Sequence, residues 1–281
     1  MKTKLILASL FAILLTSCSH NSSSSNEEED LSDGIPTVYM PLKINNFWKY
    51  NVSSTYNGTV TPSKDSLYVS NDTLINSITN KKMKSVGQDP SGPATGFYSS
   101  IIHNNSVRID GARLKLTGIV NLPTLISDPI TINLNDFTIF KENAAAGIEL
   151  SSVSGDFSRT IETYLLNFNY TFKSVSDENL ASYTTNGQIY TNIKKTKLVL
   201  NLTVTYPTVI GGIATSLTVL PAQDIIVTTQ YYAKNIGVIY NDTTIQYALN
   251  PAAASSLNLP STVPVSGNLT QQESVTTYQL N

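Results

Sequence analysis

The chain has 281 residues, of which 41% are apolar, enough for one large β domain or two small ones with a substantial core. Only 14% of the residues are charged and the formal net charge is −2, so we expect no basic surface for nucleic acid. One cysteine excludes an internal disulfide, and two histidines are too few for a multi-histidine metal centre. We therefore expect neither a bound metal nor another cofactor.

The N-terminus has the parts of a bacterial lipoprotein signal peptide. Two early lysines precede an apolar run over residues 5–15, which is too short to span a bilayer. The run ends in Leu-Thr-Ser-Cys at residues 15–18, and this segment resembles the lipoprotein processing box. The resemblance implies that residues 1–17 are removed and that Cys18 receives a diacylglyceryl group on its sulfur. Such a lipid would anchor the mature chain to a membrane.

Residues 18–34 are rich in Ser, Asn and acidic side chains, which predicts a disordered tether after the lipidated cysteine. The acidic run Glu27–Asp30 resembles the surface-export signal of Bacteroidota lipoproteins, and Ser19 favours transfer to the outer membrane. This resemblance implies an outer-membrane protein that faces the cell exterior. The periplasmic leaflet is the alternative location.

From about residue 35 onward, β-branched and aromatic residues alternate with Thr, Ser and Asn, and helical periodicity is nearly absent. The alternation is clearest in residues 164–173 and 198–206, where every second side chain is apolar. We predict one all-β domain over residues 35–281, a strongly curved antiparallel sheet or incomplete β-barrel of long strands with only short helices. The same alternation also permits a transmembrane barrel.

Turn residues and caps predict where several elements begin and end. Asn57-Gly58 and Gly211-Gly212 each predict a two-residue hairpin loop. Residues 274–280 return to strand character and are expected to close the sheet beside an N-terminal strand. Short helices are also expected at 177–183, capped by Ser176, and at 251–256, with a turn at 142–146 and a long loop at 248–268.

Two segments resemble a broad group of Bacteroidota lipoproteins. Residues 39–50 carry a Pro-Leu, an Asn-Asn turn and a Trp-x-Tyr strand, as in the opening of that group. Residues 230–239 are similar to its late Tyr-Ala-x-x-x-Gly-Val strand pair. Asn45 stands where Gly is common, and Asn tolerates the positive φ of such a turn. The resemblance implies a curved sheet or incomplete barrel and an extracytoplasmic location, but no reaction.

The tryptophan and one glycine of these segments have structural interpretations. Trp48 shares a strand face with Tyr50 and Val52, so we expect it to seal one end of the core with its N–H at a partner. A ligand platform is the alternative role for this side chain. Gly237 predicts a bulge or a close backbone approach.

No catalytic constellation emerges, and we expect no enzymatic activity. His103 follows two isoleucines and precedes two asparagines, which predicts a strand end entering a turn, and no Gly-x-Ser-x-Gly motif accompanies it. A hydrolase with paired carboxylates is a lesser alternative. The candidate carboxylates, among which nothing selects a pair, are Asp65, Asp72, Asp110, Asp128, Asp136, Glu142, Glu149, Asp156, Glu162 and Asp224.

Three short motifs resemble the O-glycosylation sequon of Bacteroidota, an Asp followed by Ser or Thr and then a methyl-bearing residue. They make Ser66, Thr73 and Thr243 candidate glycosylation sites. The resemblance implies sugars that solubilise and shield the surface.

These patterns predict a lipid-anchored extracytoplasmic protein that acts as a binding or display module. A concave apolar face of the sheet would accept a hydrophobic small molecule, a glycan or a surface protein. A structural or adhesion component without a ligand cavity is the alternative, because the same alternation of side chains also builds a filled core.

Overall fold

The computed structural model describes residues 36–89, 92–123, 129–161, 163–258 and 264–281, so the predicted signal peptide, Cys18 and the tether lie outside it. None of the helices it describes is long and apolar enough to cross a membrane. In chain order the elements are β1 (Phe47–Tyr56), β2 (Thr59–Ile75), β3 (Ile78–Val86), α1 (Phe97–Ile102), β4 (Ser106–Asp110), β5 (Arg113–Leu122), β6 (Ile130–Lys141), β7 (Glu149–Ile161), β8 (Tyr164–Ser176), β9 (Leu180–Thr185), β10 (Gln188–Ile210), β11 (Ile213–Ala233), β12 (Gly237–Ala248), α2 (Pro251–Ser256) and β13 (Ser266–Gln279).

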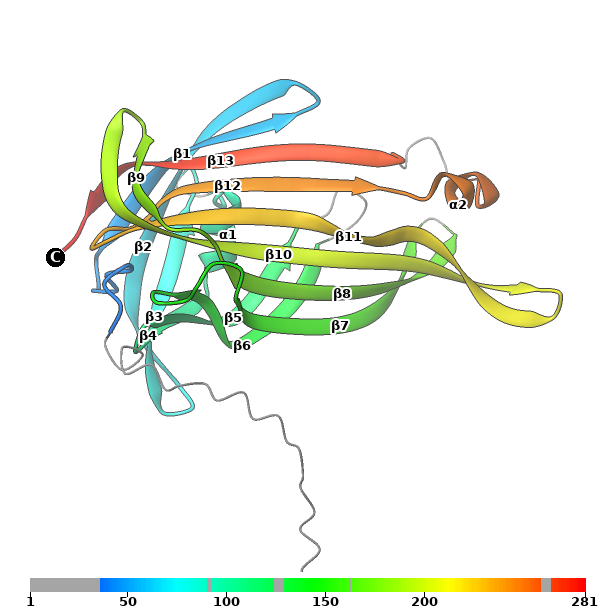
Figure 1. Ribbon diagram of the computed structural model, residues 1–281, viewed down its shortest axis with the longest axis horizontal. Helices are drawn as coiled ribbons and strands as arrows, with labels where there is room; N and C mark the ends of the chain where they lie inside the picture. The colour runs from blue at the N-terminus through cyan, green and yellow to red at the C-terminus, as the bar shows by residue number, and fades with distance from the viewer. Residues whose placement is uncertain (1–35, 90–91, 124–128, 162, 259–263) are drawn as a thin grey trace, which may run out of the picture. The chain divides into compact units, whose positions relative to one another are not determined.

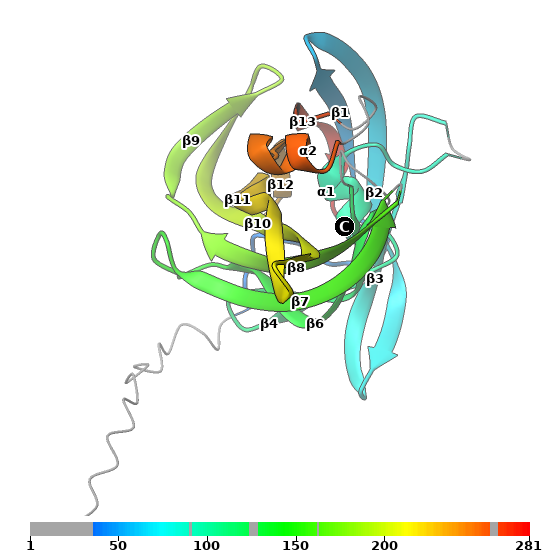
Figure 2. The same cartoon turned by 90° about the vertical axis from the view of Figure 1, so that its right-hand side faces the viewer.

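The strands form one antiparallel sheet that curls into a barrel-like wall (Figure 1, Figure 2). Its order is β6-β5-β4-β3-β2-β1-β13-β12-β11-β10-β8-β7, and β9 pairs with β10 outside this path. The first and last strands are neighbours in the middle of the order, where Trp48 pairs with Tyr278 and Tyr56 with Leu269. The predicted all-β class, with long curved strands and only short helices, is confirmed.

Side-chain alternation builds the wall because successive residues of a strand point to opposite faces. In β8, Leu166, Phe168 and Phe172 are buried while the side chains between them are more exposed. The hairpin loops at Asn57-Gly58 and Gly211-Gly212 occur where they were predicted. Beyond Thr205, where the pairing of β10 with β8 ends, β10 and β11 continue as a two-stranded ribbon, drawn in yellow in Figure 1.

The two ends of the sheet, β6 and β7, meet without a ladder of backbone hydrogen bonds in the described part of the chain. The N–H of Thr138 donates to Ser151 Oγ at 2.9 Å, and Ser174 Oγ donates to the carbonyl of Thr138 at 2.5 Å. Phe137 stacks on Phe172 beside these bonds, with 5.4 Å between ring centroids. Ser174 and Phe172 belong to β8, the neighbour of β7. We call this contact of β6 with β7 and β8 the seam, and side chains hold it.

Trp48 seals the core as predicted. It is fully buried, and its Nε1 donates to the carbonyl of Ile236 at 2.6 Å. The next residue, Gly237, has φ +111°, and a Cβ there would lie 3.1 Å from Trp48 Nε1, so the close approach at this glycine is made by the tryptophan side chain and not by a second segment of backbone. Asn45 adopts φ 71°, as its turn requires.

Two local predictions are wrong and one is wrong in part. Residues 177–183 contain no helix: Leu180–Thr185 is β9, and Tyr183 packs against Tyr231 with 4.5 Å between ring centroids. Pairing with β10 therefore overrides the local helical signal. The residues before His103 form α1 and not a strand end. Within the predicted loop 248–268, the helix expected at 251–256 forms, but β13 already begins at Ser266.

Candidate functional site

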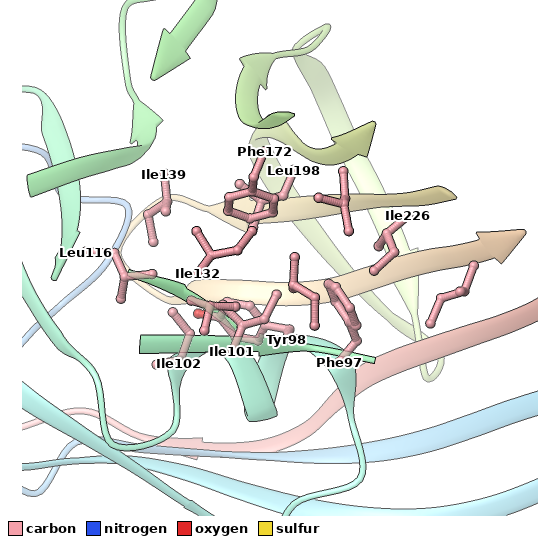
Figure 3. Close-up of a cluster of buried hydrophobic side chains, with 14 of the residues drawn as sticks. Phe97, Tyr98, Ile101, Ile102, Leu116, Ile132, Ile139, Phe172, Leu198 and Ile226 are labelled. Carbon is pink, nitrogen blue, oxygen red and sulfur yellow. The ribbon is translucent and has the colours of Figure 1, made fainter. Parts of the chain in front are cut away.

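The short helix α1 lies inside the curled sheet (Figure 2). Figure 3 shows its side chains among buried side chains of the surrounding wall, which come from β5, β6, β8, β10 and β11. Because α1 packs against this wall, it fills part of the interior, and the sheet encloses a helix as well as its own side chains. The cluster includes Phe97, Tyr98, Ile101 and Ile102 of α1, with Leu116, Ile132, Ile139, Phe172, Leu198 and Ile226 of the wall.

The wall caps the first turn of α1, because the helix has Gly96 at its N-cap and no side-chain cap there. Asp65 Oδ2 accepts from the Gly96 N–H and Gln271 Oε1 accepts from the Phe97 N–H, both at 2.6 Å. The next two amides donate to Glu273, at 2.6 and 3.2 Å. A Cβ on Gly96 would collide with the Glu273 carboxylate, so glycine allows this close approach. Side chains of β2 and β13 thus satisfy four consecutive amides.

Glu273 is fully buried, and this desolvation raises the pKa of its carboxyl to about 7. Hydrogen bonds from Ser99 and Tyr98 act in the opposite direction, because they favour the charged form. Asn241 Nδ2 also donates to Glu273 Oε1, at 3.3 Å. Burial outweighs these bonds, so near neutral pH the carboxyl exists in both protonation states.

A buried polar network extends from Glu273 across the inner face of β12 and β11. We define it as Thr228, Asn241, Thr243 and Glu273. Thr228 Oγ1 donates to Asn241 Oδ1 at 2.7 Å, and Asn241 Nδ2 donates to Thr243 Oγ1 at 3.0 Å. Beside this network, Tyr98 Oη and Gln230 Nε2 are buried without a hydrogen-bond partner among the described residues.

A cavity of about 320 Å³ lies between α1 and the inner faces of β12 and β13. Gln271 Nε2 is already engaged there, with Ser54 Oγ at 2.8 Å and the Thr95 carbonyl at 3.0 Å. The cavity is open to solvent on one side, because Thr95, Ser100 and Asn121 in its lining are exposed. The lining residues are Thr95, Phe97, Ser100, Ile101, Asn121, Pro123, Pro129, Thr243, Ile245, Leu269 and Gln271.

The predicted modification sites do not come together. Cys18 lies outside the described residues. Ser66 and Thr73 are half-buried on β2. Thr243 is fully buried in the network. Its hydroxyl is therefore inaccessible to a glycosyltransferase in the folded protein, and the prediction of a glycosylation site at Thr243 is wrong. The candidates that remain are Ser66 and Thr73.

His103 ends α1 and has a structural partner. Its Nδ1 accepts from the N–H of Ser85 at 3.0 Å, which ties the end of the helix to β3. The histidine also hydrogen-bonds Asn104 through Nε2, at 2.7 Å. These contacts give His103 a structural role, because they hold the end of α1 against β3.

Among the carboxylates considered for a hydrolase, Asp110 and Asp136 form an exposed ion-pair cluster with Arg108 and Lys115. Hydrogen bonds from Lys115 and Arg108 lower the pKa of Asp110 and of Asp136, respectively. Asp65 lies near Glu273, but both carboxylates accept hydrogen bonds from α1 and neither lines the cavity. The described residues include no group of three or more side chains suited to a metal ion.

Local sequence patterns predict neither α1 as a helix nor Glu273 as an interior residue. A signal for both was present in β13. Alternation directs Gln271, Glu273 and Val275 to the interior, so two consecutive inward positions are polar. Buried polar side chains need partners, and this requirement could have indicated an element inside the sheet.

No protein-family model matches the chain, and no curated protein matches it in sequence. Two crystal structures show a weak similarity in fold. One is a candidate lipoprotein from Parabacteroides distasonis, with a TM-score of 0.40 and 14% identity over 86% of this chain and 99% of the other. The second is a candidate exported protein with a YmcC-like fold from Bacteroides fragilis, with a TM-score of 0.42 and 9% identity over the same shares.

Proposed function

We propose that this chain is a lipid-anchored extracytoplasmic protein that binds one small, mainly apolar molecule in the cavity between α1 and strands β12 and β13. It acts by binding and carries out no reaction. The observation that carries this proposal is the cavity itself. At about 320 Å³ it falls at the lower end of the range of ligand sites, roughly 300–1,000 Å³.

The chemistry of the lining supports an apolar ligand. Phe97, Ile101, Ile245 and Leu269 contribute apolar surface from three different elements. Most polar side chains of the lining that the structure describes already have protein partners, as Gln271 does. A strongly polar ligand would have to displace these bonds, whereas an apolar ligand would gain from leaving water.

The proposed location at the outer membrane is supported by the N-terminal sequence. The charged start, the short apolar run and the Leu-Thr-Ser-Cys segment that ends at Cys18 support lipidation of this cysteine. The acidic run Glu27–Asp30 supports the exterior of the outer membrane, with the periplasmic leaflet as the alternative. A protein held there by its lipid would collect its ligand from the surroundings of the cell envelope.

The test compares small molecules that co-purify with the full-length protein from membranes of its native host. The protein is denatured and the released molecules are identified by mass spectrometry. Leu269→Trp places a larger side chain in the cavity, whereas Ile119→Trp makes the same kind of change at a residue that is 54% exposed. We expect wild type and Ile119→Trp to release one class of apolar molecule in similar amounts, and Leu269→Trp to release about a tenth or less.

Equal release from Leu269→Trp and wild type would place any bound molecule elsewhere. No enrichment above the detergent-solubilised membrane background would favour the structural or adhesion role instead.

A further inference from the structure

A second hollow, of about 530 Å³, lies on the outer side of the sheet and is separate from the interior cavity. Lys49, Asn51, Lys64 and Ser66 belong to the exposed or half-buried face of β1 and β2, opposite the buried residues of the same strands. The residues that line it are Lys49, Tyr50, Asn51, Lys64, Asp65, Ser66, Gly87, Gln88 and Thr276.

The strand register places three lysines around Ser66. Lys49 is its direct partner across the β1–β2 pair, and Lys64 lies two residues away on the same face of β2. Lys84 pairs with Tyr68 and is therefore a diagonal neighbour of Ser66 on β3, at a separation of roughly 7–8 Å. All three lysines are exposed. Two of them, Lys49 of β1 and Lys64 of β2, line the hollow, and the strand register places Lys84 beside it on β3.

No described carboxylate lies within salt-bridge distance of Lys49, Lys64 or Lys84, although other lysines are paired, such as Lys195 with Asp177 at 3.2 Å. Asp65 also lines the hollow, but its carboxylate accepts from the N–H groups of Thr95 and Gly96. The positive charge of the hollow therefore remains without a neutralising partner on a chain whose formal net charge is −2.

We propose that this hollow binds an acidic polysaccharide. The lysines span β1 to β3, about 10 Å at the usual strand spacing, so they suit several anionic groups along a chain better than one enclosed anion. Ammonium groups act as adaptable point charges toward carboxylate, sulfate or phosphate. The side chains of Asn51, Gln88 and Thr276 add donors and acceptors for sugar hydroxyls.

The predicted glycosylation site Ser66 stands in the middle of this hollow, where an attached sugar would compete with a polysaccharide for space. The test therefore uses full-length protein produced in a host that lacks this modification. Binding is measured against immobilised heparin, as a sulfated polysaccharide, and against neutral dextran, each at low and high salt.

The variant Lys49→Gln/Lys64→Gln/Lys84→Gln removes the three charges around Ser66. The matched control, Lys173→Gln/Lys194→Gln/Lys234→Gln, removes three charges outside the hollow from lysines that also have no described carboxylate partner. We expect the hollow variant to bind heparin at least about tenfold more weakly than wild type, and the control to stay within about twofold. Binding by wild type should weaken with salt, because exposed charges are screened.

Equal losses in both triple variants would show that only net charge matters and would overturn the proposal. Comparable binding to dextran would overturn it as well. Stronger binding of wild type to a single-stranded DNA oligomer or to vesicles of anionic lipid than to heparin would assign the hollow to another partner. Unchanged thermal unfolding of both variants establishes that losses do not reflect misfolding.

Discussion

Glu273 joins three parts of the interior through one carboxyl group. β13 carries it, α1 donates the Tyr98 and Ser99 amides to it, and β12 contacts it through Asn241. Because desolvation outweighs these hydrogen bonds, its pKa rises from 4.5 to about 7. Folding therefore takes up a proton at this residue between these two pH values.

The protonation of Glu273 makes stability depend on pH. A raised native pKa adds stability that is fully present below about pH 4.5 and is lost as the pH rises through about 7. The shift corresponds to about 3 kcal/mol. We expect the Tm of wild type to fall between about pH 5 and pH 8, and Glu273→Gln to remove most of this fall. Thermal unfolding across this range measures it.

The control for this measurement is Glu149→Gln, at the exposed start of β7, which should keep the wild-type slope. If Glu273→Gln and wild type lose stability equally as the pH rises, another group is responsible for the pH dependence.

At the scale of elements, the sequence predicts the strands and turns that depend only on neighbouring residues. The alternation in β8 and β10 and the Gly-Gly loop between β10 and β11 identify these strands without reference to the rest of the chain. α1 has only six residues, and its amides are capped by Asp65, Gln271 and Glu273, as far as 175 positions away. Because these partners lie far away in the sequence, local periodicity does not predict the helix, and only the inward polar positions of β13 indicate that some element lies inside the sheet.

The seam, where β6 meets β7 and β8, can be tested through one hydrogen bond between β8 and β6. Ser174→Ala removes the donor to the Thr138 carbonyl, and a buried acceptor without a partner costs about 1–3 kcal/mol. We expect chemical denaturation to show this loss and hydrogen exchange to show faster opening of β6. Ser154→Ala removes only an exposed bond to Thr171 on the β7–β8 pair and should cost less than about 0.5 kcal/mol. Similar losses of stability in both variants would show that the seam bond contributes no more to the free energy of unfolding than an exposed bond within the sheet.

At the scale of the whole molecule, the all-β class follows from composition and from the alternation of apolar and polar residues. The closure of the sheet at the seam, and the cavity beside α1, did not follow from them. Alternation determines which side chains face inward but not how much volume they enclose, because that volume depends on the curvature of the complete sheet. The inward polar residues Gln271 and Glu273 show the same limit, since only the folded sheet reveals the helix that they hold.

The location of the whole molecule is predicted to depend on Cys18. Cys18→Ser removes the sulfur that would carry the lipid, and we expect the protein to leave the membrane fraction and lose lipid labelling, because the acyl chains supply the anchoring free energy. Fractionation and metabolic labelling with a fatty acid measure both effects. A matched Ser17→Ala variant keeps the cysteine and should remain in the membrane. Retention of Cys18→Ser there would refute lipid anchoring.

The pairing of β1 with β13 has a consequence for the order in which the chain folds. The two strands join residues more than two hundred positions apart, as the bond from Thr276 Oγ1 to the Lys49 carbonyl illustrates, with a separation of 227. Contacts of such long range form slowly, since a long loop must close first. During synthesis β1 keeps one open edge until the 14 residues of β13 arrive. The protein thus remains vulnerable to aggregation and proteolysis until its last strand is made.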